Sequence, residues 1–125
     1  MSLPHVLFLI AAILSLLGAL AHELAGAPKV LKPLRDTDLP DDVIWLHHFS
    51  WHVGTVAVLA MAVMFLLAIW HPAGSIFALI ASAMSGGFAL FGVCLAIFGN
   101  AALWRTPAPY PWGIIAIFGL TGALL

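Results

Sequence analysis

The stretch VAVLAMAVMFLLAIW, residues 56–70, contains only apolar side chains and decides the fold class of this chain. It ends a longer run, residues 41–70, that follows the segment DLPDD. Asp38, Pro40, Asp41 and Asp42 in that segment are residue types that favour the start of a helix. A helix needs about 20 apolar residues to cross the core of a bilayer. Residues 41–70 therefore predict a transmembrane helix.

Three more apolar runs flank this one, at residues 4–25, 75–99 and, more briefly, 110–125. Gly26 and Pro28 supply a stop for the first run. No Lys or Arg precedes that run, so we expect a retained helix and not a cleaved signal peptide. Together the runs predict an all-α fold: an integral membrane four-helix bundle, up-down-up-down. It forms one domain, residues 1–125, with an amphipathic loop, residues 26–40, at the membrane surface.

Composition supports this class and excludes others. Of the 125 residues, 64% are hydrophobic and 7% are charged, whereas soluble domains carry roughly 25% charged residues. Four Lys and Arg against five Asp and Glu form no basic patch, so we expect membrane lipid and no nucleic acid as a partner. Cys94 is the one cysteine, which excludes an intramolecular disulfide.

The distribution of positive charge predicts an orientation. All basic residues lie in the first and third loops, namely Lys29, Lys32, Arg35 and Arg105. The positive-inside rule then places these loops in the cytoplasm and both termini outside, in the inner (plasma) membrane of a bacterium.

Two of the predicted spans divide into a small, polar face and a bulky face. In lipid the bulky face looks outward and the small face packs against other helices. His22 and Glu23 lie on the small face of the first span and should point into the protein. That face comprises Ala11, Ala12, Ser15, Gly18, Ala19, His22, Glu23 and Gly26, opposite Ile10, Ile13, Leu14, Leu17, Leu20 and Leu24; Ser82, Ser85 and Gly86 mark the equivalent face of the third span.

The segment HHFSWH, residues 47–52, concentrates three of the six histidines at the start of the second span. His48 and His52 are spaced i,i+4 and share a helix face, as paired metal ligands do. His22 should lie at a similar depth on the neighbouring helix, with Glu23 beside it. The four residues predict a site for a transition metal (Zn, Cu or Fe) at the cytoplasmic membrane boundary. Residues that could surround these ligands are His47, Asn100 and Arg105.

Other interpretations use the same residues. His22 with His48 or His52 could be the axial pair of a haem. Without a cofactor, His22, Glu23 and His52 could act as general acid and base. The cluster could also be structural, in a homo-oligomer or in a subunit of a larger membrane complex. The interpretation we favour is a metal site that binds or acts on a lipid- or quinone-like head group; the sequence leaves open whether it is an enzyme.

Overall fold

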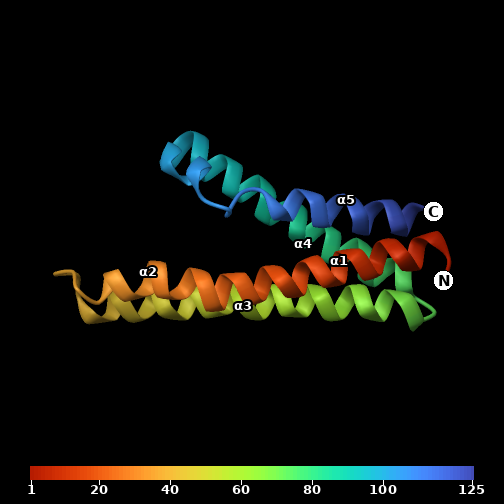
Figure 1. Ribbon diagram of the computed structural model, residues 1–125, viewed down its shortest axis with the longest axis horizontal. Coiled ribbons are helices and arrows are strands. Elements are labelled where there is room, and N and C mark those ends of the chain that lie inside the picture. The colour runs from red at the N-terminus through yellow and green to blue at the C-terminus, as the bar shows by residue number, and fades with distance from the viewer.

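The computed structural model describes residues 1–125, and its regular structure is all helical, without strands (Figure 1). The predicted all-α class is therefore confirmed. The elements are α1 (Leu3–Leu20), the π-helical turn η1 (Ala21–Gly26), α2 (Ala27–Leu34), α3 (Asp41–Trp70), α4 (Gly74–Cys94), the π-helical turn η2 (Leu95–Gly99), the 3-10 helix η3 (Ala101–Arg105) and α5 (Pro111–Leu124).

Three continuous helical segments are long and apolar enough to cross a membrane: Leu3–Leu34, Asp41–Trp70 and Gly74–Gly99. The fourth apolar helix, Pro111–Leu124, is shorter. In Figure 1, α1 with α2 and α3 form a long pair, and α4 diverges from this pair toward the end that carries η3. α5 packs against both α1 and α4, and both termini lie at the same end (Figure 1).

The first helix differs from its predicted length. Gly26 and Pro28 do not end it, because the helical path continues to Leu34 and only residues 35–40 connect it to α3. The π turn η1 ends at Gly26, two residues before Pro28, where a regular α-helix would have to accommodate a missing N–H and the proline ring. Much of the segment predicted as a surface loop is therefore a helix, α2, that lies along α3.

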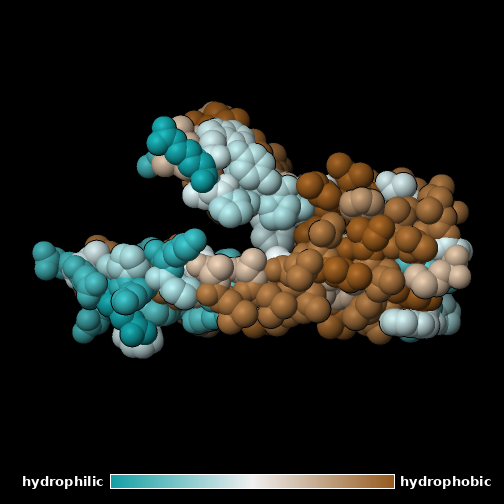
Figure 2. Space-filling model, in the orientation of Figure 1, coloured by the Kyte–Doolittle hydropathy of each residue, from teal (hydrophilic) through white to brown (hydrophobic).

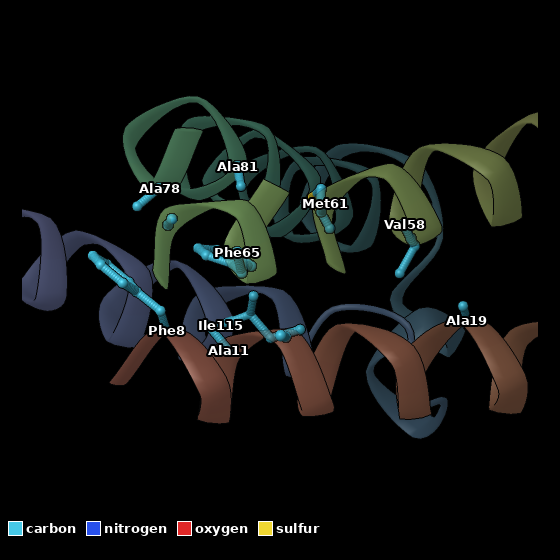
Figure 3. Close-up of a cluster of buried hydrophobic side chains, with 11 residues drawn as sticks. Phe8, Ala11, Ala19, Val58, Met61, Phe65, Ala78, Ala81 and Ile115 are labelled. Atoms are coloured by element: carbon cyan, nitrogen blue, oxygen red, sulfur yellow. The ribbon is translucent and has the colours of Figure 1, made fainter. Parts of the chain in front are cut away.

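The core is built mainly from small side chains around a few large ones (Figure 3). Phe65 and Met61 of α3 are completely buried, and Phe8 of α1 and Ile115 of α5 are nearly so. Alanines of α1 and α4 surround them, namely Ala11, Ala12, Ala19, Ala78 and Ala81. Small residues at these positions let the helix backbones approach one another closely.

Two glycines of α5 make close helix contacts. A Cβ added at Gly119 would overlap the ring of Phe65 and the hydroxyl of Ser82. A Cβ added at Gly122 would lie 2.7 Å from the ring of Phe8. Both positions therefore require glycine for α5 to pack against α1, α3 and α4.

The predicted facing of α1 and α4 is confirmed for most residues, although Leu14, expected on the bulky outer face, packs against the core. Ala11, Ala12, Ser15 and Ala19 are buried, whereas Leu17, Leu20 and Leu24 are exposed. On α4, Ser82 and Ser85 are buried, and their hydroxyls donate to the carbonyls of Ala78 and Trp112, each at 2.7 Å. The small faces thus form the interior, and their hydroxyls are satisfied there.

The surface divides along the long axis of the molecule. Apolar residues cover the broad end, where the termini lie (Figure 2). Hydrophilic residues gather at the opposite end, over α2 and the start of α3, and on part of the tip of the arm formed by η2 and η3, whose upper edge is apolar (Figure 2). The candidate site lies on the hydrophilic side of this boundary.

Candidate functional site

The π turn η1 places two consecutive polar residues against different parts of α3. His22 and Glu23 are both half-buried, and each contacts α3 through its own partners. π-helical turns are rare and occur frequently at functional sites. η1 therefore identifies this part of the helix pair as a candidate site.

His22 is engaged with Trp51. The two rings stack with their centroids 4.0 Å apart and an interplanar angle of 7°. Nε2 of His22 lies 3.2 Å from the carbonyl oxygen of Trp51, to which it donates. The six-membered ring of the indole also packs on Gly26, where an added Cβ would lie 2.8 Å from Cζ2 of Trp51. His22 thus belongs to the packed interface between η1 and α3.

Glu23 lies in a second cluster. Its carboxylate accepts a hydrogen bond from Oγ1 of Thr55 at 2.8 Å. Nδ1 of His52 lies 3.1 Å from Oε1 of Glu23 and 3.2 Å from Oε2, which makes this the one ion pair of the structure when His52 is protonated. With Nδ1 directed at the carboxylate, Nε2 is the free nitrogen of His52.

A groove of about 430 Å³ runs between the η1–α2 segment and α3. It contains two basic side chains, Lys32 and Arg35, and one acidic side chain, Glu23, which His52 and Thr55 already engage. The formal charge of the groove is therefore 2 − 1 = +1, and +2 when His52 is protonated. Its lining residues are Glu23, Ala27, Pro28, Leu31, Lys32, Arg35, His48 and His52.

His48 is the buried polar residue of this groove. Only 9% of it is exposed, and its Nε2 has no hydrogen-bond partner. Its ring lies 5.2 Å from that of Trp45 and 6.4 Å from that of His52, measured between centroids. A buried ring nitrogen without a partner is costly. His48 lines the groove, but its unpartnered Nε2 is itself buried.

The predicted metal ligands do not assemble as a set of four. Glu23, His48 and His52 line one groove, but His22 is directed to Trp51. No three His, Cys, Asp or Glu side chains gather closely enough to hold a metal ion. From depth and spacing, the sequence predicted that the four ligands converge. In the structure, the rotation of η1 about the helix axis directs His22 and Glu23 to different partners.

The residues expected to surround the ligands lie elsewhere. Nδ1 of the exposed His47 is 2.8 Å from the carbonyl oxygen of Val43 on its own helix. Asn100 caps η3 by accepting from the backbone N–H of Ala102 at 2.9 Å, and Arg105 ends that helix. η3 belongs to the diverging arm in Figure 1, and none of these residues lines the groove.

Three residues of the candidate site were missed by sequence reasoning. Lys32 and Arg35 were not among the predicted site residues, because the segment that carries them was expected to be a loop. Their spacing with Leu31 on an amphipathic helix could have indicated α2, since Leu31 is its buried residue. Thr55 shares a face with His48 and His52, and this spacing was the available signal for its contact with Glu23.

Comparison with known protein families, with curated proteins and with solved structures found no match.

Proposed function

We propose that this chain is an integral membrane protein of four spans, arranged up-down-up-down, that binds the phosphate of a lipid head group in the groove between α2 and α3. In this proposal both termini lie outside, and the groove lies at the cytoplasmic boundary of a bacterial inner membrane. The observation that carries the proposal is the groove itself, where Lys32, Arg35 and a buried, unpartnered His48 line one cavity.

Helix lengths support the depth. α3 has 30 residues, which corresponds to about 45 Å at 1.5 Å per residue. The bilayer core is about 30 Å thick, so roughly ten residues of α3 extend beyond it. If Trp70 marks the outer boundary, the extension covers His48, and His52 lies close to the inner boundary. The groove then opens at the level of the lipid phosphates.

The chemistry of the groove favours a phosphate over a quinone. Lys32 and Arg35 carry positive charge and can donate hydrogen bonds to phosphate oxygens. The imidazole of His48 lines the same groove, and its buried Nε2 has no protein partner that would compete with a ligand. The one carboxylate of the groove is turned to His52 and Thr55. A quinone offers neutral carbonyl oxygens and would gain much less from these cations.

A direct test compares a lipid that carries a phosphate-containing head group with one that carries none. Purified protein in detergent is titrated with phosphatidylglycerol and with diacylglycerol of the same acyl chains, and bound lipid is measured by native mass spectrometry. We expect phosphatidylglycerol to bind the more tightly. Lys32→Gln should weaken this binding by about tenfold, because a charged hydrogen bond contributes about 1.5 kcal/mol or more.

Lys29→Gln is the matched control, because Lys29 lies on the same helix, is exposed and does not line the groove. It removes the same charge from the protein and should leave the affinity nearly unchanged. Equal losses of affinity in the Lys32 and Lys29 variants would show that the effect comes from the general surface charge and not from the groove. Equal binding of the two lipids would refute the proposal.

His48→Leu separates binding from stability. Replacing a buried unpartnered imidazole with an apolar side chain removes a desolvation cost of about 1–3 kcal/mol. We expect the variant in lipid-free detergent to be at least as stable as the wild type. Its affinity for phosphatidylglycerol should nevertheless fall. A loss of stability would show that the imidazole of His48 contributes a stabilising hydrogen bond to the fold.

A transition-metal site is the second candidate, and one observation favours it. Glu23 accepts from Nδ1 of His52, as carboxylates commonly do behind a metal-bound histidine, which leaves Nε2 of His52 and Nε2 of His48 free. Two protein ligands are few for such a site, so head-group binding ranks first. Stoichiometric zinc, copper or iron in protein purified without a histidine tag, lost in His48→Leu, would reverse this order. The haem alternative stays a prediction that no observation here favours.

A further inference from the structure

The contact between α2 and α3 is thin compared with that between η1 and α3. Leu31 is the one buried residue of α2, with 6% of its surface exposed. The side-chain hydrogen bonds and the ion pair that reach α3 from this part of the chain come from His22 and Glu23 of η1, and none comes from α2. The chain is therefore anchored to α3 as far as Glu23, and beyond it mainly by one apolar side chain.

The part of α3 that contacts this segment contains polar atoms without partners. His48 lines the groove together with Leu31, and the indole of Trp51 packs on Gly26, the residue directly before α2. Nε2 of His48 and Nε1 of Trp51 are both buried, and neither has a hydrogen-bond partner. Burial of an unpartnered polar atom costs free energy that contact with water would recover. The docked position of α2 therefore includes an unfavourable contribution.

The backbone directly after η1 can act as a hinge. The N–H of Ala27 donates to the carbonyl of His22 in the π turn, but Pro28 has no N–H with which to continue the ladder. A bend at Pro28 therefore breaks one backbone hydrogen bond fewer than it would in an uninterrupted helix. At the other end of α2, residues 35–40 connect it to α3 outside any helix. Such a bend leaves the contacts of His22 and Glu23 in place.

We propose that α2 is a hinged cover of the groove, which moves between a position docked on α3 and a position released from it. On the basis of the proposed function, a lipid phosphate in the groove holds α2 in the docked position. Lys32 and Arg35 lie on the α2 wall of the groove and His52 on the α3 wall. A phosphate that contacts both walls binds the docked form better than the released form, and so shifts the population toward it.

Hydrogen–deuterium exchange followed by mass spectrometry, on the full-length protein in detergent, measures the release of α2. A helix of eight residues is marginally stable on its own in water, so the amides of α2 lose protection whenever it is released. We expect residues 29–34 to exchange faster than residues 45–52 of α3, which lie at the same end of the helix pair. Equal protection of the two segments in the lipid-free protein would refute the hinge.

Two pairs of variants separate docking from general stability. Leu31→Ala removes the apolar contact and should speed the exchange of α2 about tenfold, whereas Val30→Ala, at an exposed position of the same helix, should change it little. His48→Leu removes the buried unpartnered nitrogen and should slow the exchange of α2, whereas His47→Leu, at an exposed position, should not. Faster exchange of α2 in His48→Leu would refute the idea that this nitrogen opposes docking.

The lipid arm of the experiment tests the closure. At saturation, phosphatidylglycerol should slow the exchange of α2 about tenfold and diacylglycerol of the same acyl chains should not, because only the former contributes a phosphate to both walls. If phosphatidylglycerol binds more tightly than diacylglycerol but leaves the exchange of α2 unchanged, closure by the lipid is refuted and the phosphate site stands. If phosphatidylglycerol does not bind more tightly, the phosphate site and the closure both fall, while fast exchange of α2 in the lipid-free protein still supports the hinge.

Discussion

Replacing Gly119 with alanine tests the packing that holds the four helices together. The added Cβ would overlap the ring of Phe65 and the hydroxyl of Ser82. Neither can yield easily: Phe65 is completely buried, and the buried Ser82 is held by its hydrogen bond to Ala78. We therefore expect α5 to be forced outward, with a loss of stability.

The magnitude follows from a comparison within the same helix. Forcing an extra methyl group into a packed core costs about 1–3 kcal/mol, while alanine gains about 0.8–1 kcal/mol over glycine in helix propensity. Gly113 also lies in α5, and an added Cβ there would meet nothing within 4 Å. Because Gly113→Ala shares most of the propensity gain, the difference between the two variants should be about 1–3 kcal/mol.

Unfolding in mixed detergent–SDS micelles, followed by tryptophan fluorescence, measures both free energies. The second substitution Phe65→Leu should lose stability alone but recover part of the loss of Gly119→Ala, since it removes ring atoms that the new methyl meets. If Gly119→Ala is as stable as Gly113→Ala, α5 does not pack against α3 and α4 at this distance. The reasoning from close helix contacts would then be refuted.

Three further predictions follow from facing, orientation and the site. Leu17→Ala should change the unfolding free energy in micelles by less than Gly119→Ala, because Leu17 is exposed on the outer face of α1; a larger loss would mean that this face is covered. In a background without Cys94, a cysteine at Lys29 should react with a membrane-impermeant thiol reagent only from the cytoplasm and one at Pro72 only from outside, both being exposed positions; the reverse pattern would invert the orientation. Thr55→Val should keep the fold but remove a donor to Glu23, so that His52 is held less firmly and phosphatidylglycerol binds more weakly; unchanged affinity would show that the Glu23 cluster does not support the groove.

The sequence alone determined the features that depend on local pattern. Apolar length predicted the helical segments, and the alternation of small and bulky residues predicted which face of α1 is buried, as Ala11 and Ser15 against Leu17 show. Both follow from properties of one helix: its rise per residue and its 3.6-residue turn. No knowledge of neighbouring helices is needed to obtain them.

The tertiary structure decided how the polar residues pair. His22 and Glu23 are adjacent in the chain, yet one stacks on Trp51 and the other meets His52 and Thr55. The sequence could place His22, His48 and His52 at a similar depth, but not set the rotation of one helix against another. One residue corresponds to about 100° of rotation in an α-helix, and a single π turn changes that angle for everything after it. After η1 the helical path continues as α2, and Lys32 and Arg35 come to line the groove beside α3. The rotation of α2 about its axis, which brings them there, could not be deduced from the local sequence.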